Sequence, residues 1–285
     1  MKAVCITDIH GYFETALETF KLLENETDLT LLKDGEWSGE HQLIVNGDVF
    51  DRGPKNREAL EWVLRQENVT YHIGNHEFMA MFPEVAEDFL SEEYLSNASE
   101  SGLYWKHMNK SMRRELLERV AKGEIRVASK PHEYIYSHAG LEKINVERAN
   151  SQLKNAGEKL LKGLNSGSEE FKDAQNSIIN VINDGNGNEI RSKYPKLFDL
   201  NRTDSGSVGS GGAVWRRFNY LETSSKQVVG HTKGSYMKEH SGELNPQRKG
   251  KALNINTIRD YVSGDGRVAL TIEDSEGLEV FELSP

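Results

Sequence analysis

The first 82 residues repeat one pattern three times: a short apolar run, a polar loop, and an apolar pattern with helical spacing. The apolar runs are Ala3–Ile6, Leu43–Val45 and Val69–Ile73. Strands that alternate with helices in this way build a parallel sheet, so the pattern predicts an α/β fold. We expect the three polar loops to meet at the carboxyl edge of that sheet, where open α/β sheets bind ligands.

The second of these loops, Asn46–Gly53, concentrates charge in one short turn. It places Asp48, Asp51 and Arg52 directly after a run that reads as a buried strand. Charges at the edge of a core are costly unless they are compensated. A metal ion held by the carboxylates and an anionic substrate held by the arginine would compensate them. The loop therefore predicts a metal site next to an anion site.

The other polar loops supply the ligand types that such a site needs. Each follows a candidate strand, and together they contribute Asp8, His10, Asn75, His76, His138 and His231. Carboxylates, imidazoles and an amide oxygen without thiolates suit manganese, iron, zinc or nickel better than a structural zinc site or a calcium cage. Two ions about 3.5–4 Å apart need a shared ligand, and an aspartate such as Asp48 can bridge them.

The region from about residue 143 to 212 has a different pattern. Apolar residues keep a heptad-like spacing from Val146 to Leu164 and again from Phe171 to Ile182, which predicts an inserted helical hairpin. This spacing reports only packing, so the insertion is equally well a structural buttress or a substrate-selecting cap. A glycine- and serine-rich stretch, residues 205–212, is expected to form a flexible loop before Trp215-Arg216-Arg217.

The C-terminal part alternates polar and apolar residues in two runs, Leu253–Thr257 and Val268–Ile272, with a turn signal at Gly264–Gly266 between them. This pattern predicts a hairpin in a second sheet. No linker separates an independent unit, so we expect a single domain over residues 1–285 that includes the helical insertion.

Composition excludes some classes of partner. The formal net charge of -10 and the pI of about 5.5 argue against a nucleic-acid-binding surface or a membrane surface, both of which attract basic faces. The single cysteine, Cys5, cannot form an internal disulfide and is expected to pack as a small core residue. The N-terminal residues lack a long apolar segment. We expect a soluble cytoplasmic protein, and the sequence does not predict its oligomeric state.

Five motifs together resemble the phosphoprotein phosphatase branch of the calcineurin-like metallophosphoesterases, and in particular its prokaryotic and phage serine/threonine phosphatases. No single motif of this length identifies a family, whereas five in the family's order at predicted strand ends do. The resemblance extends from Ala3 to about Ile272. The motifs are Asp8–Gly11, Gly47–Gly53, Gly74–Glu77, Ser137–Gly140 and Gly230–Thr232.

The resemblance implies a β-sandwich of two mixed sheets flanked by helices, with the helical segment inserted. It also implies two divalent metal ions, with manganese expected first and iron, zinc or nickel as alternatives. By the resemblance, the first ion is held by Asp8, His10 and Asp48, and the second by Asp48, Asn75, His138 and His231.

The resemblance assigns the remaining motif residues to catalysis. His76 would protonate the leaving oxygen, Asp51 would orient His76, and Arg52 would hold the phosphoryl oxygens. Small prokaryotic and phage members carry tryptophan, any residue and then arginine, so we expect Arg217 rather than Arg216 to be the second phosphate clamp. Glu77 is expected to anchor the loop rather than to bind metal.

Two positions depart from the patterns of related enzymes. Thr7 stands where many family members have glycine, and we expect it to affect only how closely the backbone approaches. His10 stands where symmetrical dinucleoside tetraphosphatases carry glutamine, which disfavours that activity.

The sequence therefore predicts a phosphatase that acts on phosphomonoesters, above all phosphoserine and phosphothreonine in proteins, and also on small phosphoesters. A nucleotide phosphodiesterase or a dinucleoside polyphosphate hydrolase on the same fold is the alternative. A non-catalytic phosphate-binding protein is a more distant alternative, because a decayed site would lack metal ligands and none is missing from this sequence.

Overall fold

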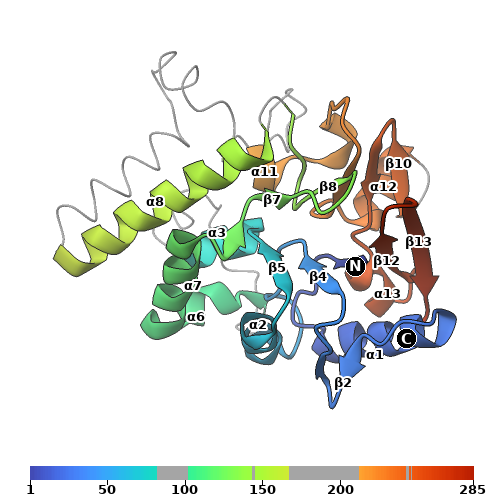
Figure 1. Ribbon diagram of the computed structural model, residues 1–285, viewed down its shortest axis with the longest axis horizontal. Coiled ribbons are helices and arrows are strands. Elements are labelled where there is room, and N and C mark those ends of the chain that lie inside the picture. Colours follow the sequence, from blue (N-terminus) through green and yellow to red (C-terminus); the bar gives the residue numbers. More distant parts are fainter. Residues whose placement is uncertain (82–101, 143–144, 167–211, 242–243, 245) are drawn as a thin grey trace.

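The computed structural model describes residues 1–81, 102–142, 145–166, 212–241, 244 and 246–285. Two β-sheets form its centre (Figure 1), with strand orders β13-β12-β1-β4-β5-β6 and β10-β11-β9-β8-β7. The first sheet contains β1 (Ala3–Ile6), β4 (Gln42–Val45), β5 (Val69–His72), β6 (Ile125–Arg126), β12 (Val268–Glu273) and β13 (Leu278–Leu283). The second contains β7 (Ala128–Ser129), β8 (Ile135–Ser137), β9 (Gln227–Val229), β10 (Gln247–Lys249) and β11 (Ala252–Asn254).

The pairing within the sheets positions the loops. In the first sheet β1, β4, β5 and β6 pair in parallel, and in the second sheet β8, β9 and β11 do so. Parallel strands bring their carboxyl ends to one edge, so the loops that follow them converge. The strand–loop–helix repeat of the sequence is confirmed, and its three loops follow β1, β4 and β5.

Apolar side chains hold the two sheets face to face. One buried cluster joins Cys5 and Ile44 of the first sheet to Tyr136, Val228 and Leu253 of the second. Cys5 is free and fully buried, as expected for a small core residue. The mixed α/β architecture with two sheets and flanking helices confirms the predicted fold class.

Helices cover the outer faces of the sheets (Figure 1). A large cluster packs the outer face of the first sheet against its helices, and a smaller one joins α12 to the second sheet. A small hairpin pairs β2 (Leu32–Lys33) with β3 (Glu36–Trp37). The helices are α1 (Phe13–Glu26), α2 (Asn56–Arg65), α3 (Asn75–Met81), α6 (Tyr104–His107), α7 (Lys110–Lys122), α8 (Val146–Ser166), α11 (Gly212–Trp215), α12 (Gly234–Ser241) and α13 (Ile258–Val262), with a 3-10 turn at Phe218–Tyr220.

The first arm of the predicted helical insertion is α8, which packs against α7 (Figure 1). Its heptad-like positions Ala149, Leu153 and Leu160 are buried, as the spacing predicted. The second arm and the glycine-rich stretch lie outside the described residues. Whether the insertion is a cap or a buttress stays a prediction.

The prediction of a C-terminal hairpin is wrong. β11 belongs to the five-stranded sheet, whereas β12 pairs antiparallel with β1 and β13 in the six-stranded sheet. The turn at Gly264–Gly266 follows α13, which crosses from one sheet to the other. Alternation correctly indicated strands, although both are buried along their whole length. It carries no information about which strand pairs with which.

Candidate active site

The centre of the site is one carboxylate oxygen, Oδ2 of Asp48, surrounded by three imidazoles. It lies 3.7 Å from Nε2 of His10, 3.7 Å from Nε2 of His76 and 3.5 Å from Nε2 of His138. Two groups of side chains could each hold a metal ion. The first consists of His10, Asp48 and His76, and the second of Asp48, His138 and His231. Asp48 is thus shared by both groups, as a bridging ligand must be.

Asn75 completes the second group. Its Oδ1 lies 3.1 Å from Nε2 of His138 and 2.9 Å from Nδ1 of His231. The other nitrogen of His138, Nδ1, contacts the carbonyl oxygen of Asn46 at 2.8 Å, which fixes the ring so that Nε2 faces the centre. Asn75, His138 and His231 therefore converge on one point, and their role as ligands of a second ion stays a prediction.

Asp8 lies beside His10. Its Oδ1 is 3.8 Å from Nε2 of His10 and accepts a hydrogen bond of 2.8 Å from Nδ2 of Asn256. The backbone N–H of His231 donates to the same carboxylate at 3.0 Å. The hydroxyl of Thr7 also donates to Asp8. The expectation for Thr7 is therefore wrong, because its side chain orients a candidate ligand directly.

His76 makes a second contact that distinguishes it from the other histidines. Its Nδ1 lies 2.5 Å from Oδ2 of Asp51, and the other oxygen of Asp51 accepts a hydrogen bond of 3.0 Å from the backbone N–H of Trp105 at the start of α6. Asp51 thus fixes the imidazole of His76, and the backbone of Trp105 fixes Asp51. Its other nitrogen, Nε2, points toward Asp48.

Glu77 anchors two loops to each other, as predicted, and is fully buried. Its Oε2 accepts hydrogen bonds of 2.8 Å from the backbone N–H groups of Asp48 and Gly74. Its Oε1 accepts from the backbone N–H of Val49 at 2.9 Å and from the hydroxyl of Tyr71 at 2.6 Å. Gly74 is required here, because a Cβ at that position would overlap the Asp48 side chain.

Burial dominates the electrostatics of this cluster. It raises the pKa of Asp8 and of Asp51 to about 7 each and raises the pKa of Asp48, to which the charge of Glu77 adds. Burial also lowers the pKa of His10, His76 and His231. Buried carboxylates and neutral imidazoles in one place form a site that divalent cations would neutralise, so the donor set fits a two-metal centre.

The two arginines after Trp215 point to different places. The Arg216 side chain is 3% exposed, and its Nε lies 3.4 Å from Oε1 of Glu142. Arg217 is half-buried over the ring of Tyr236. After burial, its charge is the largest cause of the lowered pKa of His231. This placement favours Arg217 over Arg216 as the residue that faces the site.

The sequence did not indicate three residues that the fold brings here. Asn256 contacts Asp8, while Lys233 and Arg259 contribute positive charge that lowers the pKa of His76. Asn256 follows the carboxyl end of β11, but its alternation with Ile255 reads as a continuing strand, so the rule that identified the other loops missed it. Lys233 and Arg259 carry no such signal.

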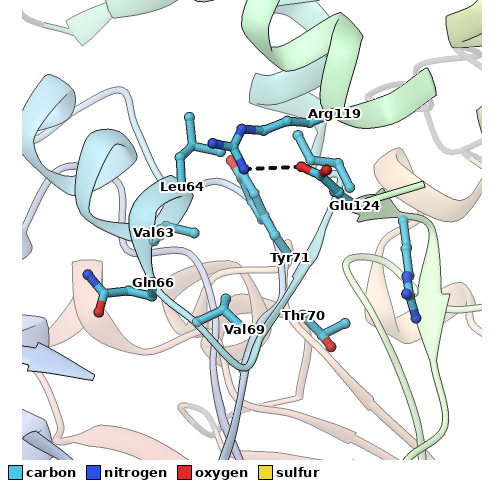
Figure 2. Close-up of a pocket in the computed structure, with 10 residues that line it drawn as sticks. Val63, Leu64, Gln66, Val69, Thr70, Tyr71, Arg119 and Glu124 are labelled. Atoms are coloured by element: carbon cyan, nitrogen blue, oxygen red, sulfur yellow. Dashed lines mark hydrogen bonds and ion pairs between the residues drawn. The ribbon is translucent and has the colours of Figure 1, made fainter. Parts of the chain in front are cut away.

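A pocket elsewhere on the molecule contains none of the predicted site residues. It lies between α2, β5 and the end of α7, and Figure 2 shows Tyr71 at its centre and the ion pair between Arg119 and Glu124 at its rim. Tyr71 connects the pocket wall to the site, because its hydroxyl reaches Glu77.

A family model described as calcineurin-like phosphoesterase matches residues 1–241. The chain belongs to the calcineurin-like phosphoesterase family. Members of this family are hydrolases, and the described part of the chain supplies the clustered aspartates and histidines that a metal-dependent phosphoesterase needs. In these described segments, none of the helices of this calcineurin-like phosphoesterase has the length and apolar character needed to cross a membrane.

Solved structures share the fold of this phosphoesterase at low sequence identity. A mutant form of a cold-active protein tyrosine phosphatase has a TM-score of 0.56 at 16% identity, covering 99% of this chain and 77% of that one. The cold-active protein tyrosine phosphatase of a psychrophilic Shewanella species has a TM-score of 0.53 at 16% identity, covering 99% and 80%.

One curated relative matches part of the chain. The uncharacterized protein C1840.07c of Schizosaccharomyces pombe is 36% identical over 83 residues, which are 26% of this chain and 24% of that protein. The chain thus matches about a quarter of that relative's length.

Proposed function

We propose that this phosphoesterase hydrolyses phosphomonoesters, with phosphoserine and phosphothreonine in proteins as its main substrates. The observation that carries the proposal is the placement of the His76–Asp51 pair beside Asp48, the residue shared by two groups of candidate metal ligands. A proton donor next to a two-metal site is the arrangement that an alcohol leaving group requires.

Asp8, His10 and Asp48 would hold one divalent ion, and Asp48, Asn75, His138 and His231 would hold the other. Manganese, iron, zinc and nickel all suit this oxygen and nitrogen set. When bound, the ions would polarise the phosphoryl oxygens and lower the pKa of a bound water.

The side chains divide the remaining work. Arg52 and Arg217 would bind the phosphoryl oxygens, because guanidinium groups match phosphate geometry and neutralise the charge that develops. His76 would donate the proton at Nε2 to the leaving oxygen. Asp51 would hold Nδ1 and stabilise the imidazolium form.

The proposal is tested with the purified protein after metal analysis and loading with manganese, iron, zinc or nickel. Substrates would be p-nitrophenyl phosphate, phosphopeptides, a cyclic nucleotide and diadenosine tetraphosphate. Phosphotyrosine peptides belong in the panel because fold neighbours are protein tyrosine phosphatases. We expect phosphate release from p-nitrophenyl phosphate and from phosphoserine or phosphothreonine peptides. No release with any of the four metals would overturn the proposal.

Two variants separate the ligand from the acid. Asp48→Asn should abolish binding of both ions, measured as metal per protein. His76→Asn should keep the metal content but slow turnover, most strongly for leaving groups of high pKa. Loss of one ion in His76→Asn would instead make His76 a ligand, since its Nε2 is as close to Asp48 as that of His10.

A further inference from the structure

Two cations at the site have no role in the hydrolysis proposed above. Lys233 lies two residues after His231, at the entrance to α12, and Arg259 lies in α13, three residues after Asn256. Both are half-buried. Both cations therefore lie close in the chain to a residue that contacts Asp8. His231 does so through its backbone N–H, and Asn256 does so through its side chain.

Asp260 holds these two segments together. Its carboxylate accepts hydrogen bonds of 2.7 Å from the backbone N–H of Gly234 and 3.2 Å from that of Ser235. Lys233 and Arg259 are the chain neighbours of these bonded residues, one on each side of the contact. Their backbones are thus fixed to each other and to the edge of the site.

Neither side chain forms a close ion pair with a carboxylate of the described residues. In the described ranges, the ammonium of Lys233 and the guanidinium of Arg259 make no ion pair and no hydrogen bond. Asp260, which adjoins Arg259 in the chain, uses its carboxylate on backbone amides. Its charge acts on both cations, and that of Asp8 acts on Arg259, without a close contact. Half-buried cations without a counter-ion destabilise a folded chain, unless a ligand supplies the missing charge.

The two cations extend the positive charge of the phosphate clamps. After burial, the charges of Arg259, Arg52 and Arg217 are the causes that lower the pKa of Lys233 to about 8. The charges of Arg259 and Lys233 also act on His76, the proposed donor to the leaving oxygen. The proposed function uses Arg52 and Arg217 for one phosphoryl group, so Lys233 and Arg259 add positive charge near His76 that this group does not use.

We propose that Lys233 and Arg259 bind a second phosphate group of the substrate, placed beside the scissile one on the leaving-group side. The inference rests on the proposed function and narrows its substrate class. A second phosphate has two sources: a phosphoanhydride such as inorganic tripolyphosphate, or a neighbouring phosphorylated residue of a peptide. Both offer the same chemistry to the two cations.

The reaction balances in either case. The oxygen of water forms the new P–O bond and one of its protons passes to solvent, while the bridging P–O bond breaks and the leaving oxygen keeps the electron pair. An alcohol leaving group takes a proton from His76. The pyrophosphate that leaves from tripolyphosphate is a much weaker base than an alkoxide, so Lys233 and Arg259 neutralise its charge and solvent protonates it after release.

The test compares substrates that differ in the second phosphate, with manganese in excess over any chelating substrate. One pair is a peptide phosphorylated once or at two adjacent residues. The other is p-nitrophenyl phosphate against inorganic tripolyphosphate. We expect the native protein to prefer the two-phosphate member of at least one pair, and the pair that shows the preference identifies the source.

The variant Lys233→Met/Arg259→Met keeps apolar stems but removes both charges. It should reduce the ratio of kcat/KM between two-phosphate and one-phosphate substrates by about tenfold or more, since each lost charge-assisted contact weakens binding by that order. The matched control is Lys238→Ala, an exposed cation on the same helix, which should leave the ratio unchanged. Thermal melting establishes that both variants are folded.

A binding measurement keeps the inference testable without turnover. Titration calorimetry of the manganese-loaded native protein should show tighter binding of methylenediphosphonate than of methylphosphonate, and the double variant should lose this difference. Equal binding of the two, or a substrate preference that survives in the double variant, overturns the inference. Turnover of p-nitrophenyl phosphate without any two-phosphate preference would overturn it while leaving the proposed function intact.

Discussion

At the scale of single residues, backbone strain is concentrated in the candidate site. Among the described residues, eight that are not glycine have a positive φ, and six of them were predicted site residues from the sequence. Such conformations cost about 1–3 kcal/mol each and persist only where the surroundings impose them. The six are Asp8, His10, Asp48, Asp51, Arg52 and His231, with φ between 49° and 83°.

Hydrogen bonds between the loops impose this strain. The backbone N–H of Asp8 donates to the carbonyl oxygen of Gly47 at 3.1 Å, and that of His10 donates to the carbonyl oxygen of Asp48 at 2.9 Å. The first two loops therefore hold each other in conformations that neither would adopt alone. The strain aims the side chains of adjacent residues at one centre.

The two arginines after Trp215 should respond oppositely to truncation. Arg217→Ala should lower kcat/KM for p-nitrophenyl phosphate by about 10²–10³, the effect of removing one donor to a developing anion. Its melting temperature should stay near that of the native protein, because Arg217 is only half-buried over Tyr236.

Arg216→Ala is the matched control. It removes the partner of Glu142 from a side chain that is 3% exposed, so it should destabilise the fold by about 3 kcal/mol. Thermal melting and steady-state kinetics on both variants separate the two effects. A larger kinetic defect in Arg216→Ala than in Arg217→Ala, measured well below both melting temperatures, would reverse the assignment.

At the scale of elements, the sequence predicted the site wherever an apolar run ended abruptly on a polar loop. That rule identified the loops after β1, β4, β5, β8 and β9, because each of these strands is largely buried and is followed directly by a turn that contains glycine and charged or polar residues. It missed the loop after β11, where Asn254 and Asn256 alternate with Ile255 and read as a continuing strand. Alternation reports a polar face, but it does not say whether that face meets solvent or a buried site.

Other misses had a different cause. The pairing of β12 with β1 joins residues that are far apart in the sequence, and periodicity contains no information about such partners. The same holds for Lys233 and Arg259, whose charges interact with that of Arg52 and whose segments are joined by the contact of Asp260 with the start of α12.

The contact between α7 and α8 depends on a glycine in the middle of a helix. A Cβ at Gly157 would lie 2.7 Å from Cγ1 of Val120 and 2.9 Å from the backbone nitrogen of Ala121. Glycine costs a helix about 1 kcal/mol relative to alanine, so its position here reflects close packing. We expect Gly157→Val to separate α8 from α7 and to lower the melting temperature by several degrees.

An exposed position on the same helix provides the control. Asn155→Ala should leave stability unchanged or raise it slightly, since alanine is the better helix former and the Asn155 side chain is exposed. If α8 is a buttress, Gly157→Val should keep its turnover of p-nitrophenyl phosphate at low temperature. An unchanged melting temperature would contradict the close contact itself.

At the scale of the whole molecule, net charge conceals the arrangement that matters. The chain carries -10 overall, yet half-buried Arg52, Arg217, Lys233 and Arg259 lie around buried carboxylates at one edge of the two sheets. The acidic surface argues against extended polyanions, and the local cations favour a small anionic group that enters the site. Composition could predict the first of these properties but not the second.

The stabilisation that a bound metal ion gives to the fold should depend on pH. In the metal-free protein the raised pKa of Asp8, about 7, keeps this carboxyl protonated in mildly acidic solution, and a metal ion must displace the proton. For each proton displaced, metal affinity should rise up to tenfold per pH unit below pH 7, which is about 1.4 kcal/mol of added stabilisation. The increase in melting temperature caused by manganese should therefore be larger at pH 7.5 than at pH 5.5.

The rise in melting temperature caused by manganese is the quantity to compare, because two kinds of titratable group change the stability of the metal-free protein with pH in opposite directions. Carboxyls with a raised pKa, Asp8 and Asp51, contribute stability that is full below about pH 4 and is lost as the pH rises to about 7. Buried imidazoles with a lowered pKa, His10 and His231, contribute stability that is lost as the pH falls below 6.5. Asp48→Asn should abolish the increment at every pH. A manganese increment that is the same at pH 5.5 and 7.5 in the native protein would mean that no proton leaves Asp8 on binding, and Asp8 would then not be a ligand.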